Sequence, residues 1–195
     1  MIKRAGAGHR LFGMFCAVAL LAGSGCCKVD DLVKLPDETQ EGKQTFGCLL
    51  DDKIWIPYTD HTVDDKMEAS YSPNAGGGTT FTVSAEQYDD NTDHTEFTLG
   101  LTRPVIQPGT YQLSEGFNAR FERIKRGGGI DTYTTTGAST GSITITKVEA
   151  GSSTSTIGNV TVRYTIVSGT FRFTAVSAGG QVITVKDGRF DAKAY

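Results

Sequence analysis

The chain has 195 residues, with 19 Lys or Arg, 22 Asp or Glu and a formal net charge of −3. A mildly acidic chain without clustered Lys and Arg is not typical of nucleic-acid-binding proteins, and it disfavours electrostatic docking on anionic lipid. Gly occurs 24 times, and Thr and Ser are frequent after residue 50 where Ala and Leu are scarce, which favours strands over helices.

The N-terminus has the organisation of an export signal. Three basic residues and no acid precede an apolar run over 11–22, which is too short to span a bilayer. Small residues follow, and then Cys26. This order resembles a bacterial lipoprotein signal, and the resemblance implies that Cys26 begins the mature chain and carries a diacylglyceryl group. The alternative is an ordinary secretory signal that is cut nearby without lipid.

The sequence therefore predicts a signal peptide over 1–25, the lipidated Cys26 with a flexible tether over 26–43, and a single all-β domain over 44–195. The tether is polar and lacks an apolar period. Its residues 28–31 resemble the Lys-plus-acid export signal of surface-displayed lipoproteins of Bacteroidetes-type bacteria, with a merely charged linker as the alternative. We expect lipid attachment to the outer membrane, on its periplasmic or its surface face.

Two cysteines are left in the mature chain besides the lipidated one. Cys27 and Cys48 can pair in an oxidising compartment and tie the tether to the first strand. The alternative is that Cys48 is a small buried apolar residue and Cys27 a linker residue, since two cysteines at this spacing do not make a disulfide framework.

The first predicted element of the domain is a hairpin over 44–57. Phe46, Cys48 and Leu50 lie on one face of its first strand, and the Asp pair 51–52 supplies the turn. Further strands are predicted over 67–72, 79–87, 95–102, 109–113, 119–126, 130–136, 142–149, 160–166, 170–174, 182–185 and 189–195.

Three of the later segments carry specific expectations. The Thr-rich stretch 130–136 is expected at a sheet edge or in a mobile flap, and 150–158 is predicted to be a loop. Residues 186–188 are predicted to form a turn or bulge, and the alternating apolar side chains of 160–166 should share one face. With no helical period and turns every 8 to 12 residues, we expect an antiparallel β-sandwich or a partly closed β-barrel of about ten short strands.

Both ends of the domain resemble one family. The start LPDETQEGKQTFGCLLDDKIWIP (35–57) and the end SGTFRFTAVSAGGQVITVKDGRFDAKAY (168–195) are similar to the opening and closing segments of an uncharacterised lipoprotein family of Bacteroidetes-type bacteria, a domain of unknown function. Asp37 replaces a Pro of that pattern, and residues 51–52 stand at its Asn-Gly turn. The resemblance implies kinship and no particular activity.

Asp89, Asn91 and Asp93 are the best metal candidates. Their alternation places oxygen atoms on one side of a tight loop, as Ca²⁺ requires. His94, however, stands where a calcium loop needs Gly, and no Glu follows at the twelfth position. A solvated hairpin tip is the alternative, and no other cofactor is predicted.

A catalytic arrangement is not recognisable in the sequence. His61 and His94 are the only histidines after the signal peptide, both are expected in charged loops, and there is no G-x-S-x-G elbow. The Gly runs 76–78 and 127–129 precede strands and not helices, so they are predicted to be turns and not phosphate sites. A close carboxylate pair, as in glycoside hydrolysis, needs only spatial proximity, so an envelope hydrolase stays open as an alternative.

Trp55 and Tyr58 are candidates for a surface that stacks on sugar, because Ile54 and Ile56 lie on the opposite face of that strand. Core packing is the alternative for Trp55. We therefore expect a non-enzymatic binding or assembly accessory of the envelope, with the membrane as one partner through lipid, and a glycan or an envelope protein as the candidate second partner.

Overall fold

The computed structural model describes residues 34–59, 65–88, 91–155 and 158–195. Within these ranges the chain is almost entirely β, and the short 3₁₀ helix η1 (Leu113–Glu115) is the only helical element. The strands are β1 (Thr45–Leu50), β2 (Lys53–Trp55), β3 (Tyr58–Thr59), β4 (Met67–Pro73), β5 (Thr79–Tyr88), β6 (His94–Arg103), β7 (Gly109–Gln112), β8 (Phe117–Ile124), β9 (Ile130–Thr134), β10 (Gly141–Thr154), β11 (Thr161–Ser177) and β12 (Val182–Ala194).

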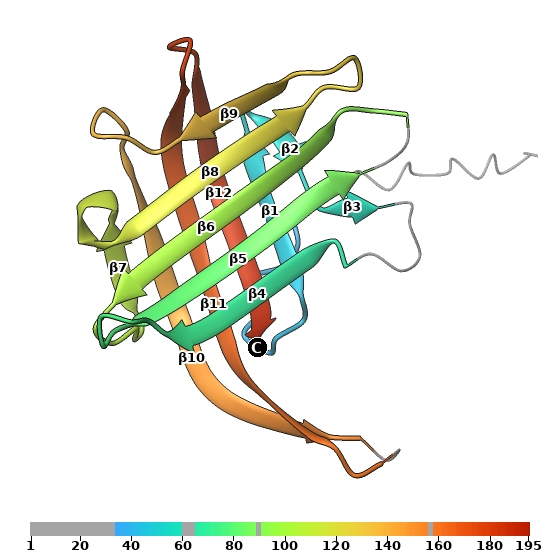
Figure 1. The fold of residues 1–195 in the computed structure, drawn as a ribbon, viewed down its shortest axis with the longest axis vertical. Coiled ribbons are helices and arrows are strands. Elements are labelled where there is room, and N and C mark those ends of the chain that lie inside the picture. Colours follow the sequence, from blue (N-terminus) through green and yellow to red (C-terminus); the bar gives the residue numbers. More distant parts are fainter. Residues whose placement is uncertain (1–33, 60–64, 89–90, 156–157) are drawn as a thin grey trace, which may run out of the picture. The chain divides into compact units, whose positions relative to one another are not determined.

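All twelve strands belong to one sheet, in the order β2-β1-β12-β11-β9-β8-β6-β5-β3, while β10 pairs with β11 and β7, and β4 pairs with β5. The sheet is mixed, since β3 and β5 run parallel. It folds back on itself into two layers whose strands cross obliquely (Figure 1). We call β3, β4, β5, β6, β8 and β9 the front layer, and the other six strands the back layer. The expected all-β class is confirmed, and the sheet is sandwich-like and not closed into a barrel.

Aromatic rings fill the space between the layers. Phe97 of β6 lies 4.7 Å from both Trp55 and Phe121, measured between ring centroids, and 6.3 Å from Phe173 of the back layer. Such edge and tilted contacts stabilise a core beyond the area that each ring buries. The inward positions were predictable, because the alternation of β1, β5, β6 and β11 places these side chains on one face of each strand.

The predicted hairpin 44–57 is confirmed. Leu50 pairs with Lys53, so Asp51 and Asp52 form a two-residue turn, and both have positive φ, 48° and 64°. Two successive residues with positive φ are what a type I′ hairpin turn requires, and Asp adopts this region more readily than most residues.

The expectation of an edge or flap at 130–136 is wrong. β9 lies between two strands, because Thr134 pairs with Arg120 of β8 and with Val176 of β11. Tyr133 is buried, and its ring lies 6.0 Å from that of Phe121. A single buried Tyr among threonines is a weak sequence signal, and here it marks the strand that joins the two layers.

At the opposite corner, the chain's last residue joins the back layer to the outer edge of β4. The Tyr195 N–H donates to the Ala69 carbonyl at 3.1 Å, and the Tyr71 N–H donates to the Tyr195 carbonyl at 3.4 Å. The two layers are therefore linked by backbone hydrogen bonds at two corners, which protects edges that would otherwise be exposed.

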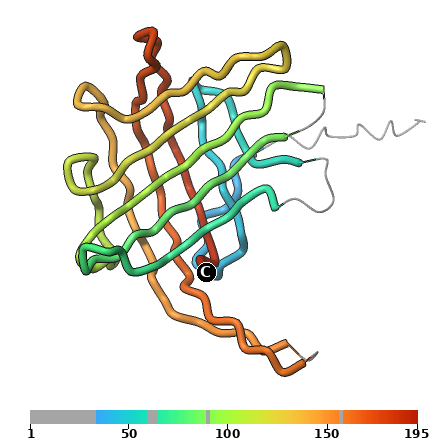
Figure 2. Tube along the Cα trace, viewed as in Figure 1, coloured from blue at the N-terminus to red at the C-terminus, as the bar shows by residue number. Residues whose placement is uncertain are grey.

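β10 and β11 continue past the layers as a two-stranded arm, which we define as residues 151–155 and 158–164. The predicted loop at 150–158 is therefore wrong in its first half, since pairing extends to Thr154 and Thr161. Figure 2 shows the arm extending away from both layers. Val160 and Val162 are 58% and 42% exposed, so neither points into the core. No layer lies opposite them to bury them.

Candidate functional site

The residues before β1 lie on the outer face of the back layer. Phe190 and Ala192 of β12 point into the core, so Asp191 between them points outward. Its side chain is nevertheless only 1% exposed, because residues 34–44, which we call the N-terminal segment, cover it. Asp191 is the only fully buried charged side chain in the described part of the chain.

Five donors surround the Asp191 carboxylate. Oδ2 accepts hydrogen bonds from the Thr39 hydroxyl at 2.6 Å and from the backbone N–H groups of Glu41 and Lys43 at 3.0 and 3.1 Å. Oδ1 accepts from the Gly42 N–H at 2.8 Å and from the Ser168 hydroxyl at 2.7 Å. We call this arrangement the Asp191 site. These hydrogen bonds satisfy the carboxylate, whose burial would otherwise cost free energy.

The Asp191 site keeps its carboxylate ionised. Burial alone raises the pKa of Asp191, but the hydrogen bonds from Thr39, Ser168 and the backbone N–H groups of Glu41 and Lys43 lower it by more, to about 2. A group that is ionised at neutral pH and fully hydrogen-bonded is neither a proton donor nor a free ligand. Its chemistry is that of an attachment point between two parts of the chain.

Gly42 is required at this position for two reasons. Its φ is +69°, in the left-handed region that favours Gly, and a Cβ there would lie 2.7 Å from Cγ of Lys193. The absence of a side chain therefore lets the backbone N–H of residue 42 reach the Asp191 carboxylate.

Further contacts hold the N-terminal segment along the layer. The Lys147 ammonium donates to the Gln40 carbonyl at 2.9 Å, and the Arg189 guanidinium donates to the Pro36 carbonyl at 3.3 Å. The predicted flexible tether over 26–43 therefore ends earlier than expected, because its residues from Pro36 onward are bound to the domain.

A hollow of 380 Å³ lies beside the N-terminal segment on the same outer face. It is lined by Glu38, Thr110, Ser142, Thr144, Thr170, Phe171, Arg172, Asp187, Gly188 and Arg189. β12 forms one side of the hollow. It contains a bulge there, because Phe171 pairs with Gly188 and Phe173 with Val185, so two steps along β11 are matched by three steps along β12. The predicted turn or bulge at 186–188 is thus confirmed as a bulge, with Asp187 at φ +49°.

Trp55, one of the two residues predicted to stack on sugar, is only 4% exposed. Its Nε1–H donates to the Thr95 hydroxyl at 3.1 Å, and its ring packs edge-on against Phe46 at 5.7 Å. Trp55 is therefore a core residue, which was the alternative, because its side chain points between the layers. Tyr58 is 52% exposed, so the two residues do not share a surface.

The predicted calcium ligands are only partly described. Asp89 lies outside the described residues, while Asp93 accepts a hydrogen bond from the Arg126 N–H at 3.2 Å and the Asn91 carbonyl accepts one from the Arg126 guanidinium at 3.0 Å. Among the described residues, no group of three or more His, Cys, Asp and Glu side chains is placed to hold a metal ion. The calcium site stays a prediction.

The remaining candidates are placed as follows. Cys26, Cys27 and His61 lie outside the described residues. Cys48 is a free thiol in the core, and burial raises its pKa. His94 was expected in a loop but begins β6, where its Nε2 lies 2.9 Å from a Glu86 carboxylate oxygen.

Sequence reasoning missed the Asp191 site. The period-two pattern of β12 marks Asp191 as an outward, solvated residue, and its partner Thr39 lies 152 positions away in a segment predicted to be a tether. The available signal was the pair of end segments that resemble one family, since Thr39 and Gly42 lie in the first segment and Asp191 in the second.

Fold and site together define an all-β, two-layer domain that binds its own N-terminal segment through a buried carboxylate. The chain belongs to the family described as Domain of unknown function (DUF6252), whose family model matches residues 70–192, more than half of the chain. The matched range includes Asp191 and the strands that line the 380 Å³ hollow, whereas the N-terminal segment lies before the matched range. Neither a curated protein nor a solved structure matches the chain. Along the parts of the chain described here, no helix has the length and apolar character needed to cross a membrane.

Proposed function

We propose that the chain is a lipid-anchored protein of the outer envelope that acts by binding, as a binding or assembly accessory and not as an enzyme. We also propose that it is kin to the lipoprotein family of Bacteroidetes-type bacteria that both end segments resemble. The mature chain would begin at Cys26, with the first 25 residues removed as a signal peptide, and the lipid on Cys26 would hold the domain at the outer membrane.

The observation that carries this proposal is the Asp191 site. A membrane anchor pulls on its domain through the residues that follow it, and here residues 39–43 are fixed to Asp191 of β12 by four hydrogen bonds, while Ser168 of β11 donates a fifth to the same carboxylate. Fixing the segment so close to the predicted anchor gives the domain a defined attachment point at the end of a short tether. From Cys26 to Pro36 the tether spans at most about 35 Å.

Chemistry also favours binding over hydrolysis. A glycosidase needs one carboxyl whose pKa is raised, so that it stays protonated and donates a proton. The one fully buried carboxyl among the described residues has the opposite property, because its pKa is lowered to about 2 and five donors occupy it. The space between the layers is filled by aromatic rings, which leaves the outer faces and the arm as the surfaces for partners.

Metabolic labelling with an alkyne fatty acid tests the anchor. The full chain, expressed with its own signal, should become labelled and sediment with the outer membrane. The Cys26→Ser variant should lose the label and the membrane association, while the matched Cys27→Ser variant should keep both. Unlabelled wild-type chain in the cytosol with its first 25 residues intact would contradict the proposal, and protease treatment of whole cells would distinguish the surface from the periplasmic face.

A further inference from the structure

The hollow on the outer face of the back layer is the start of a longer groove. A second hollow of 500 Å³ shares Ser142 and Arg172 with the first, and a third of 620 Å³ shares Gln112, Thr140 and Gly141 with the second. The groove therefore runs from the N-terminal segment across the strands of the back layer to the turn before β10. Its length suits an extended chain molecule better than a compact one.

We propose that this groove binds a neutral oligosaccharide. The inference rests on the proposed function as a binding accessory and names its ligand class and site. It replaces Trp55 and Tyr58 as the place where a glycan is recognised, because Trp55 is buried in the core.

Hydroxyl groups are the first part of the argument. Thr170 of β11 pairs with Thr144 of β10, which pairs with Thr110 of β7, so three threonines stand in a row across adjacent strands. The hydroxyls of Thr110 and Thr144 lie 2.9 Å apart. Each hydroxyl both donates and accepts hydrogen bonds, as a sugar hydroxyl does, so such a row can pair with successive hydroxyls of a glycan.

Charge selects a neutral ligand. The first hollow carries two guanidinium groups, from Arg172 and Arg189, and two carboxylates, from Glu38 and Asp187, so its formal charges cancel. An anionic ligand would meet both carboxylates, whereas a neutral sugar can donate to the carboxylates and accept from the guanidinium groups. The balance therefore favours a ligand with many hydroxyls and no net charge.

Three of these four charged side chains are available for a ligand, whereas the Arg189 guanidinium already donates to the Pro36 carbonyl. The guanidinium group of Arg172 and the carboxylates of Glu38 and Asp187 have no hydrogen-bond or ion-pair partner among the residues that the structure describes. The bulge in β12 lies opposite Arg172. Arg189 pairs with Thr170, two residues before Arg172, so Arg172 and Arg189 are diagonal neighbours on adjacent strands. Bulges are common beside binding sites because they change the direction of side chains.

An array of printed oligosaccharides tests the inference with the full chain purified in detergent micelles. The array carries neutral oligosaccharides of increasing length and matched oligosaccharides with uronic acid or sulfate groups. Wild type should retain neutral oligosaccharides, and longer ones better. Arg172→Gln should weaken retention by about tenfold or more, because it removes hydrogen bonds from a charged donor. Thr144→Val, which removes a hydroxyl at nearly constant shape, should weaken it several-fold.

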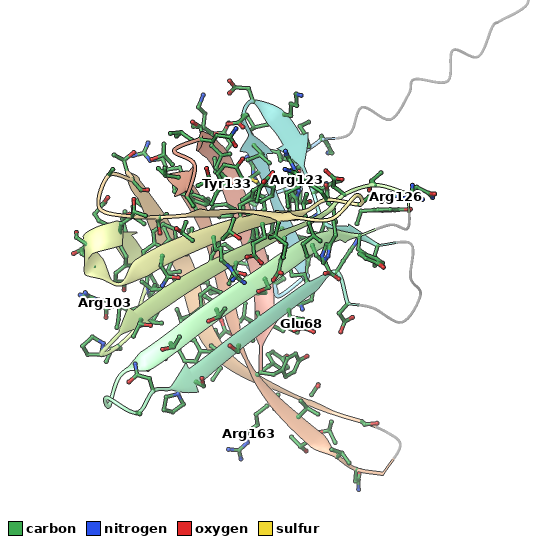
Figure 3. All side chains as sticks on the ribbon, turned by 45° about the horizontal axis from the view of Figure 1, so that its top comes forward. Glu68, Arg103, Arg123, Arg126, Tyr133 and Arg163 are labelled. Carbon is green, nitrogen blue, oxygen red and sulfur yellow. The ribbon has the colours of Figure 1, made fainter. Side chains whose placement is uncertain are left out.

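Arg163→Gln is the matched control, because Arg163 is an exposed arginine of the same strand that lies on the arm, away from the groove (Figure 3). It should bind like wild type. A wild-type chain with a normal melting curve that retains no neutral oligosaccharide overturns the inference, as does preference for the charged ones or an equal loss in Arg163→Gln. If the chain is lipid-anchored on Cys26 but fails this test, the proposed function stands and the groove assignment falls.

Discussion

A carboxylate is tolerated in a protein interior only when donors surround it, and Asp191 meets this condition with five of them. Asp191→Asn should lower the free energy of unfolding by about 2–3 kcal/mol, because the amide NH₂ group would face N–H donors and the charge-assisted bonds would be lost. Urea unfolding at neutral pH measures this. Asp187→Asn, an exposed position of the same strand, should stay within about 0.5 kcal/mol of wild type. Equal stability of wild type and Asp191→Asn would show that the site does not hold the N-terminal segment.

A second residue-level prediction concerns Gly42. Gly42→Ala should destabilise the chain by about 1–2 kcal/mol, since Ala is strained at φ +69° and its Cβ would press on the Lys193 side chain. Limited proteolysis should at the same time cut the N-terminal segment faster. Gly137→Ala is the control, because nothing lies within 4 Å of a Cβ at that position. Identical stability and proteolysis of the Gly42→Ala chain would contradict the strain argument.

At the scale of the elements, the arm differs from the rest of the sheet because neither layer covers it. Replacing residues 152–163 by Asn-Gly would join Gly151 to Tyr164, which are paired, through a two-residue turn. The melting temperature should change by only a few degrees, since a two-stranded ribbon adds little stability. Ile145→Ala in the covered part of β10 should instead cost about 2–5 kcal/mol. A large loss on removing the arm would mean that it packs against another part of the molecule.

The elements also show what sequence patterns can and cannot predict. The hairpin 44–57 and strands β5 and β6 were predictable, because alternation and turn residues are local signals. The positions of the arm and of β9 in the fold were mispredicted. They depend on whether a second layer lies opposite the strand, and no local sequence pattern encodes that. The Asp191 site was missed for the same reason, since its donors Glu41, Gly42 and Lys43 lie about 150 positions from the carboxylate along the chain.

At the scale of the whole molecule, the Asp191 site joins the two ends of the domain, so its protonation should be visible in the stability of the entire fold. The pKa of Asp191 is lowered from the ordinary 3.8 to about 2 in the folded state. The unfolded chain therefore binds the proton more tightly, and stability must fall with falling pH in this range. Above pH 4 the ionised site contributes its full share, about 2 kcal/mol. That share is lost as the pH falls from about 4 to about 2.

Acid unfolding of wild type and Asp191→Asn, followed by the fluorescence of the single Trp, buried Trp55, measures this effect. The difference in stability between the two chains should be largest above pH 4 and should shrink as the pH falls toward 2, because the proton neutralises the same charge that the substitution removes. At pH 7 a moderate increase in salt should leave the difference nearly unchanged, since the carboxylate is buried and its partners are dipoles and not ions. A difference that stays constant down to pH 2 would mean that the carboxylate's charge does not hold the two ends of the domain together.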